Sequence, residues 1–281
     1  EIKMQKEVIT NLLSKANLKE KDIDIIFGGD LLNQIVAATF CAREFDAPFC
    51  GLYNACATFG ESLCLGSVMV EKNCKNVVCI TSSHYATAER QYRFPLELGT
   101  QPTPSSQWTV TGCGGALLSN CANNCPKICS FTLGKVVDLK CTDANNMGAA
   151  MAPAACDTIV AHLKDTGRQA KYYDLILTGD LGRFGRNALD FLAKKEGYDL
   201  SDKLNDCGCL VFSREQKVCQ GGSGAGCCSL VFCAYFFEEL KKRNFKKILF
   251  VPTGALMSKD SFLQGESIPS IAHAIDIEME D

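Results

Sequence analysis

The chain has 281 residues, 47% of them hydrophobic, and a formal net charge of -3 at pH 7. This length and composition suit one large α/β domain or two fused halves around a well-filled core. The apolar run at residues 227–237 is far shorter than the roughly 20 residues of a membrane-spanning helix, and the first residues do not resemble a signal sequence. Any membrane role is therefore expected to be peripheral. Lysine and arginine occur only in short groups, so nucleic acid is not an expected partner.

Cysteine is unusually frequent, with 18 residues spread through apolar segments at positions such as Cys64, Cys79 and Cys233. A secreted protein held together by disulfides would carry so many cysteines in a much shorter chain. We interpret most of them as small core residues in a reducing compartment.

Two groups of cysteines have a spacing that suggests a metal site: Cys121, Cys125 and Cys129, and the pair Cys207 and Cys209. The first group lacks the CxxC spacing of structural zinc sites, lies in a polar connector and has no histidine nearby. We therefore expect no metal site and no cofactor.

The beginning of the chain predicts alternating helices and strands. A helix is expected over residues 3–16, strands over 23–31, 47–52 and 75–83, and a further helix from Thr58. The strands are almost continuous apolar runs, which is typical of parallel sheets covered on both faces.

A second passage repeats this pattern. The helix predicted over residues 150–163 precedes a strand over 174–181, whose GDL ending matches the ending of the first strand. Residues 53–83 and 224–254 also match, displaced by 171 positions. The repeat predicts two α/β halves with parallel sheets, related by a pseudo-twofold axis.

We expect the two halves to span residues 1–129 and 130–281. The second half opens with an apolar strand over residues 130–139, whereas the first begins inside the equivalent helix. A strand is therefore expected to be missing from the first half, which leaves a sheet edge to be filled.

Cys56 lies in the stretch NACATFGESLCLGS, between the strand over residues 47–52 and the helix that begins at Thr58. At such a turn a side chain projects over the helix N-terminus, where backbone N–H groups and the helix dipole lower the pKa of a thiol. This geometry suits a nucleophile or an anion-binding site, and a buried structural cysteine is the alternative. The internal match places Cys227 at the equivalent position of the second half.

Three motifs together resemble the thiolase-like superfamily: NACATFGESL, VTGCGGALLS and the glycine turn GGSGAG. The resemblance implies a thiolase-like fold, in which two duplicated α/β halves pack as five layers (αβαβα). It places Cys56 where the condensing enzymes keep their nucleophile. The segments TSSHYATAERQYRFPLELG, GAAMAPAACDTI, NDCGCLVFS and ESIPSIAHAI narrow the likeness to the stage V sporulation protein AD family of spore-forming bacteria.

This narrower resemblance implies a function in the spore. It implies a protein that binds dipicolinic acid (pyridine-2,6-dicarboxylate), free or as its calcium chelate, for uptake into the developing spore and release at germination. The expected partners are the SpoVA membrane proteins of the same operon, and the expected location is the periphery of the inner spore membrane. A homodimer is also implied, because the superfamily pairs its sheets across a two-fold axis.

The bases of a condensing enzyme are missing at the positions where the superfamily has them. Such an enzyme needs a base near the thiol and donors for the oxyanion, but residues 178–180 and 222–224 contain no histidine. His162 lies in a predicted helix and is interpreted either as a surface residue or as a residue whose hydrogen bonds are satisfied within the protein. His84 follows a strand and His273 precedes a predicted final strand, and each either borders the pocket or packs in the core.

The expected ligand needs hydroxyl or N–H donors for its carboxylates and an apolar slot for its ring. Hydroxyl groups are available for the carboxylates, and glycines allow close approach of the backbone. The predicted ligand-binding residues are Cys56, Thr58, His84, Gly112, Asp180, Gly222, Ser223 and Thr253.

Asp180 has two interpretations, because its carboxylate suits calcium as well as the N-cap of the helix that follows. Arg90 and Arg93 suit either the charge of the ligand or a subunit interface.

Together these observations predict a non-catalytic protein that binds dipicolinate. The alternative is a thiolase-fold acyltransferase or ketoacyl synthase in which Cys56 is the nucleophile and His84 or His273 replaces the base. A third hypothesis makes the chain a scaffold that docks membrane channel subunits.

Overall fold

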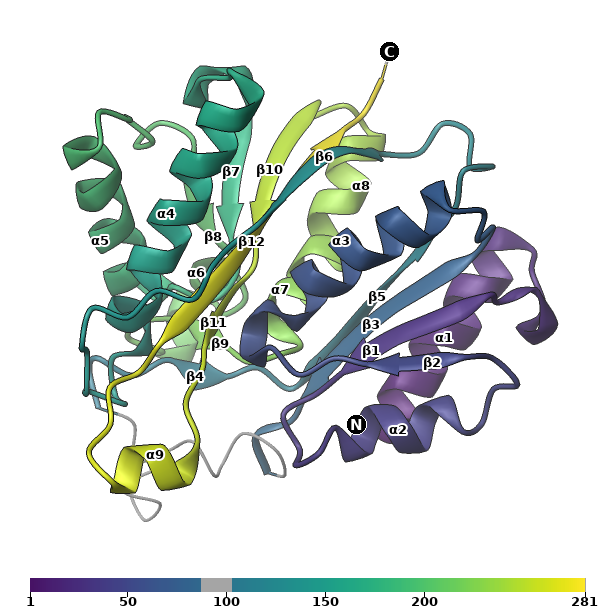
Figure 1. Cartoon of the computed structure of the whole chain (residues 1–281), viewed down its shortest axis with the longest axis horizontal. Coiled ribbons are helices and arrows are strands. Elements are labelled where there is room, and N and C mark those ends of the chain that lie inside the picture. The colour runs from purple at the N-terminus through teal and green to yellow at the C-terminus, as the bar shows by residue number, and fades with distance from the viewer. Residues whose placement is uncertain (87–102, 281) are drawn as a thin grey trace.

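The computed structural model describes residues 1–86 and 103–280, which form five layers (Figure 1). Two mixed sheets alternate with three layers of helices. Among the described residues, no helix combines the length and the hydropathy that crossing a bilayer requires.

The first sheet has the strand order β2-β1-β3-β5. Its strands are β1 (Ile25–Gly29), β2 (Phe49–Gly51), β3 (Val77–Ser83) and β5 (Gly112–Leu118). β1 pairs in parallel with β2 and β3, whereas β5 is antiparallel to β3.

Helices α1 (Ile2–Ala16) and α2 (Val36–Ala42) cover the outer face of this sheet. The buried residues of α1 are Gln5, Ile9 and Leu13. Their four-residue spacing places them on one side of the helix, where Ile9 and Leu13 join the outer core of the first half.

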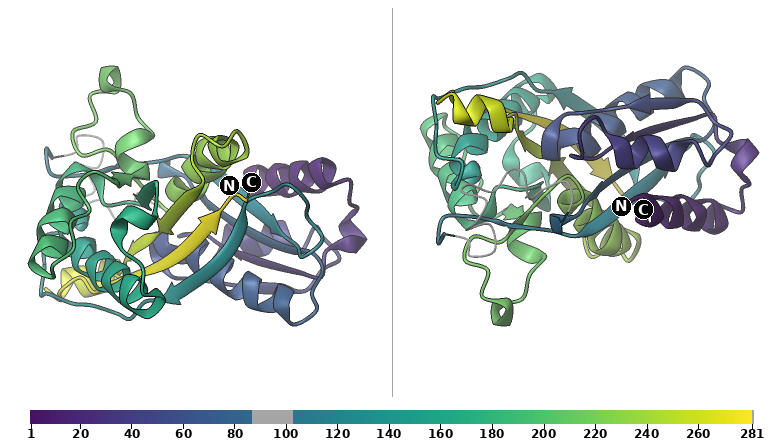
Figure 2. Two further views of the ribbon diagram at one scale, coloured as in Figure 1. Left: turned by 90° about the horizontal axis from the view of Figure 1, so that it is seen from above. Right: turned by 90° about the horizontal axis from the view of Figure 1, so that it is seen from below.

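The second sheet has the order β8-β7-β10-β12-β6. Its strands are β6 (Lys127–Leu133), β7 (Leu175–Thr178), β8 (Leu204–Asp206), β10 (Lys247–Val251) and β12 (Ser270–Glu278), and β11 (Thr253–Ala255) also pairs with β12. β12 crosses the middle of the molecule beside β6 (Figure 2). The outer helices are α4 (Met147–Thr166) and α5 (Gly182–Lys195).

The central layer lies between the two sheets. It contains α3 (Thr58–Glu71) from the first half and α7 (Cys227–Val231), a π-helical turn and α8 (Phe237–Lys241) from the second. A helix covered on both sides is apolar around most of its surface. Neighbouring side chains approach α3 closely at two glycines: a Cβ atom at Gly60 would lie 2.9 Å from the ring of Pro252, and one at Gly66 would lie 2.8 Å from the side chain of Leu118.

Short elements complete the fold. β4 (Trp108–Thr109) pairs in parallel with β9 (Gly222–Ser223) and joins the two halves. α6 (Cys207–Leu210) follows β8, and α9 (Lys259–Leu263) lies between β11 and β12.

The predicted duplication is visible in the topology, since β2, β1, β3 and β5 occur in the same order and directions as β8, β7, β10 and β12. The prediction of wholly parallel sheets is wrong. β5 runs antiparallel to β3, and β12 runs antiparallel to both β10 and β6.

Predicted strand boundaries also change. The strand expected over residues 130–139 is β6, Lys127–Leu133, and His273 lies inside the final strand β12 instead of preceding it. β6 pairs with the far edge of β12, and no strand among the described residues occupies the corresponding edge of β5.

Candidate functional site

Cys56 lies in a single 3-10 turn, Ala55–Ala57, between β2 and α3. The turn is fixed by Thr58, whose hydroxyl accepts a hydrogen bond from the backbone N–H of Asn54 (3.0 Å) and donates one to the carbonyl of Ala55 (2.7 Å). Thr58 is fully buried, whereas Cys56 is partly exposed. The predicted turn geometry at Cys56 is therefore present, and Thr58 holds it in place.

A cavity of about 390 Å³ opens beside Cys56. Its wall is largely apolar and includes Leu31 from the first half and Met147, Met151 and Met257 from the second. Methionine side chains are flexible and polarisable, so they adapt to a flat ring or an acyl chain. The cavity lies where the two halves meet.

The polar groups of the cavity come from several segments. Ser223 from β9 and the hydroxyl-bearing residues Tyr53, Ser258 and Ser261 line it together with Cys56. Ser258 is the N-cap of α9 and accepts a hydrogen bond from the backbone N–H of Ser261 (3.0 Å). No charged side chain of the described residues belongs to this wall.

The structure thus brings two of the predicted ligand-binding residues, Cys56 and Ser223, to one cavity. Two of the glycines have packing roles. A Cβ atom at Gly112 would lie 2.7 Å from Leu230, and one at Gly222 would lie 2.6 Å from Val110. Neither glycine is part of the cavity wall.

Asp180 and Thr253 are both fully buried and lie away from the cavity wall. The helix cap expected from Asp180 is supplied by Asp206. Its carboxylate accepts hydrogen bonds from the backbone N–H groups of Leu181 and Gly182, each at 2.9 Å. Asp206 was missed because it is the last residue of a different strand, β8, and reaches α5 only in the folded sheet.

His84 follows β3, and its Nδ1 accepts a hydrogen bond from the backbone N–H of Ala86 (3.1 Å). It is partly exposed and lies outside the cavity wall. Arg90 and Arg93 lie outside the described residues, so their two interpretations stay open.

His273 is buried and links the two halves. Its Nδ1 accepts a hydrogen bond from the backbone N–H of Gly134 (3.2 Å), and its Nε2 lies 2.9 Å from the side-chain nitrogen of Asn54. Burial lowers the pKa of His273 to about 4. Both ring nitrogens are engaged, and the imidazole is therefore held neutral as a tie between β12 and the Cys56 turn.

His162 is fully buried in α4. Its Nδ1 is 2.9 Å from the hydroxyl of Thr132, and its Nε2 is 2.9 Å from the hydroxyl of Tyr173. These contacts confirm the interpretation of a satisfied helix residue.

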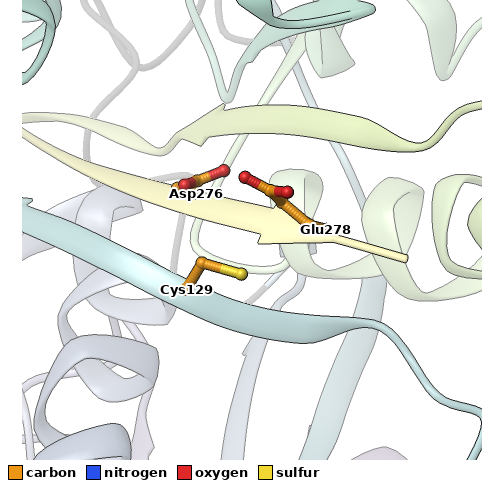
Figure 3. A group of neighbouring side chains, drawn as sticks. All are labelled: Cys129, Asp276 and Glu278. Atoms are coloured by element: carbon orange, nitrogen blue, oxygen red, sulfur yellow. The ribbon is translucent and has the colours of Figure 1, made fainter. Parts of the chain in front are cut away.

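Three potential metal ligands, Cys129 on β6 and Asp276 and Glu278 on β12, lie within 4.8 Å of one another (Figure 3). Arg168 forms ion pairs with both carboxylates, and Lys247 Nζ lies 3.7 Å from Glu278. Two cations already balance the two carboxylates, so the group is a structural ion-pair network. The predicted cysteine groups do not converge as ligand sets within the described residues.

Comparison with known proteins places this geometry in a family. The family model for stage V sporulation protein AD matches residues 1–278. A curated relative, stage V sporulation protein AD of Bacillus subtilis (strain 168), is 42% identical over 276 residues, which cover 98% of this chain and 81% of the relative. The chain belongs to the stage V sporulation protein AD family.

Solved structures show the same fold in condensing enzymes. A tetronic acid condensing enzyme has a TM-score of 0.65 at 13% identity and covers 98% of this chain and 85% of its own. 3-Oxoacyl-[acyl-carrier-protein] synthase III from Aquifex aeolicus has a TM-score of 0.58 at 14% identity, with 99% and 84% covered. OleA from Xanthomonas campestris bound with cerulenin has a TM-score of 0.66 at 12% identity, with 99% and 79% covered. The thiolase-like fold of this sporulation-family chain is therefore confirmed.

The cavity also contains functional candidates that sequence reasoning missed. Met147 and Met151 lie one turn apart at the start of α4, and Met257, Ser258 and Ser261 come from the segment around α9. These residues belong to distant segments without a local motif, so only the fold shows that they share one wall.

Proposed function

We propose that this protein binds dipicolinic acid, free or as its calcium chelate, in the cavity beside Cys56, without catalysing condensation. The observation that carries the proposal is a largely apolar cavity that has Cys56 and Ser223 in its wall and lies at the turn before α3. The volume of about 390 Å³ is at the small end of ligand pockets, which range over ~300–1,000 Å³.

The chemistry of the wall supports a flat aromatic dicarboxylate. The thioethers of Met147, Met151 and Met257 suit the faces of the pyridine ring. The hydroxyl of Ser223 suits a carboxylate oxygen. The cavity also lies at the beginning of two long helices, because the Cys56 turn precedes α3 and Met147 is the first residue of α4. The positive ends of their dipoles favour a negative ligand.

The wider role follows from the sporulation family. A dipicolinate-binding member would serve the uptake of dipicolinate into the developing spore and its release at germination. It would act as a homodimer on the periphery of the inner spore membrane, with the SpoVA membrane proteins as partners. The family membership supports this placement.

Calorimetric titration tests the ligand. Dipicolinate, with and without calcium, is titrated into the wild-type protein and the variants Cys56→Ala and Ser223→Ala. We expect saturable binding to the wild type and an affinity roughly tenfold lower in each variant, because each loses a contact worth about 1–1.5 kcal/mol. Cys74→Ala, a change at a partly exposed cysteine outside the cavity wall, is the matched control.

An absence of binding to the folded wild type would reject this ligand. The enzymatic alternative then has its own measurement, since Cys56 is partly exposed in the cavity wall at the start of α3. Acyl-CoA labelling of the wild type that disappears in Cys56→Ala would assign Cys56 as an acylated nucleophile.

A further inference from the structure

Helix α5 exposes two aromatic rings on the surface of the outer layer. Phe184 and Phe191 are 50% and 59% exposed, although they are large apolar residues. They are seven residues apart and so lie on the same side of the helix, two turns from each other. Asn187, Lys194 and Lys195 are also exposed along this helix. These five residues are called the α5 outer face.

The rings of this face are not needed for the packing of α5. The helix packs against α4 and buries Leu189 and Ala193. Its first turn is tied down separately, because the backbone N–H of Phe184 donates to the side-chain carbonyl of Gln220 (2.9 Å) and Arg183 donates to the carbonyl of Val218 (2.8 Å). The outer face is therefore held on a fixed helix while its rings remain in water.

The charge of α5 is opposite in sign to that of the whole chain. The helix carries four basic residues and one acidic residue, whereas the chain has a net charge of -3. Lys194 pairs with Asp190 at 2.8 Å. The ammonium of Lys195 lies 4.5 Å from the centre of the Phe191 ring, so cation and ring form one unit at the surface.

We propose that the α5 outer face docks on an anionic lipid bilayer surface. Aromatic rings flanked by lysines on a fixed helix suit the boundary between headgroups and acyl chains, where the rings enter the apolar region and the ammonium groups meet lipid phosphates. The inference rests on the proposed peripheral membrane location and names the surface that would make the contact. α5 is the helix at the outer end of the second half, far from β2 and α2 (Figure 1).

Co-sedimentation with lipid vesicles tests this surface. The full chain is mixed with phosphatidylglycerol-containing vesicles and with pure phosphatidylcholine vesicles, for the wild type and for a Phe184→Ser/Phe191→Ser variant. We expect the wild type to bind the anionic vesicles and to be released by added salt. The variant should partition on the order of tenfold less. A Lys194→Glu/Lys195→Glu variant should lose the preference for anionic lipid.

The matched control changes two side chains of similar exposure elsewhere, Leu133→Ser with Tyr235→Ser, whose positions are 53% and 55% exposed. It should bind vesicles as the wild type does. Wild-type protein that ignores anionic vesicles, or an α5 variant that binds them as well as the control does, would overturn the proposal. Dipicolinate titration of the same variants separates membrane docking from ligand binding. A protein that binds no dipicolinate can still bind vesicles, so failure of the ligand proposal would not decide the docking proposal.

Discussion

The buried His162 gives the stability of the protein a pH dependence. Burial, assisted by the charge of Arg168, lowers the pKa of His162 to about 4, below the ~6.5 of an unfolded histidine. Between these values the unfolded state binds more protons, so the free energy of unfolding falls as the pH drops from 6.5 towards 4. Between pH 7 and pH 5, His162 lowers the free energy of unfolding by roughly 2 kcal/mol.

Urea unfolding of the wild type and of His162→Gln at pH 7 and pH 5 measures the contribution of His162 to this pH dependence. The decrease on acidification should be roughly 2 kcal/mol smaller in the variant. Comparing the two proteins is necessary because burial raises the pKa of Asp30 to about 6, which stabilises the fold as the pH falls and partly offsets the histidines. His84→Gln, at a partly exposed histidine, serves as the control, and equal decreases in all three proteins would contradict the prediction.

Single residues of the site differ in how far the sequence predicts them. Cys56 is identified by the strand, turn and helix around it, and Ser223 by the glycine turn, because both signals are local. The methionines of the cavity wall could not be predicted, since a methionine in an apolar helix is usually a core residue. The cap predicted for Asp180 is not formed, for a physical reason. Asp180 follows a strand as Asp30 does, and Asp30 does bind a backbone N–H of α2. At the start of α5, however, the N–H groups are bound by Asp206 instead.

At the scale of elements, Asp206 holds together the start of two helices and the end of a strand. It caps α6 through the backbone N–H of Cys209 (3.1 Å), binds the first N–H groups of α5 and accepts a hydrogen bond from Thr178 (2.7 Å). Asp206→Ala leaves these buried donors without their acceptor. We expect a loss of roughly 3 kcal/mol in the free energy of unfolding.

Chemical denaturation checks this loss, with Asp202→Ala as the control at an exposed aspartate four residues away. A change below about 1 kcal/mol in Asp206→Ala would show that water or another group replaces the carboxylate.

Periodicity predicts the helices and most strands because a buried face leaves a regular apolar pattern. It does not give strand direction. β5 and β12 run antiparallel to β3 and β10, and the apolar pattern of a strand is the same for either direction. Periodicity does not predict the cavity either, because α9 contributes to its wall from an irregular segment between β11 and β12.

At the scale of the whole molecule, β2 is the outermost strand of the first sheet, and its Cys50 is exposed. In the proposed homodimer, an antiparallel pairing of two β2 strands about their centre would place Cys50 opposite its own copy. We expect mild oxidation to give a covalent dimer in the wild type and none in Cys50→Ser. Cys121→Ser, at another exposed cysteine, should behave as the wild type does.

Sedimentation velocity of the reduced protein completes this measurement. A monomer at micromolar concentration would reject the dimer, and a stable dimer that does not cross-link through Cys50 would place the interface elsewhere.

The burial of α3 between both sheets also has a consequence for the order in which the protein is made. α3 is synthesised well before β12, the strand that covers its second side. The tie from Asn54 to His273 spans the same interval. Until β12 has been synthesised, a nascent chain therefore carries α3 with one apolar side uncovered. The Cys56 turn gains its contact with His273 only after β12 has been made.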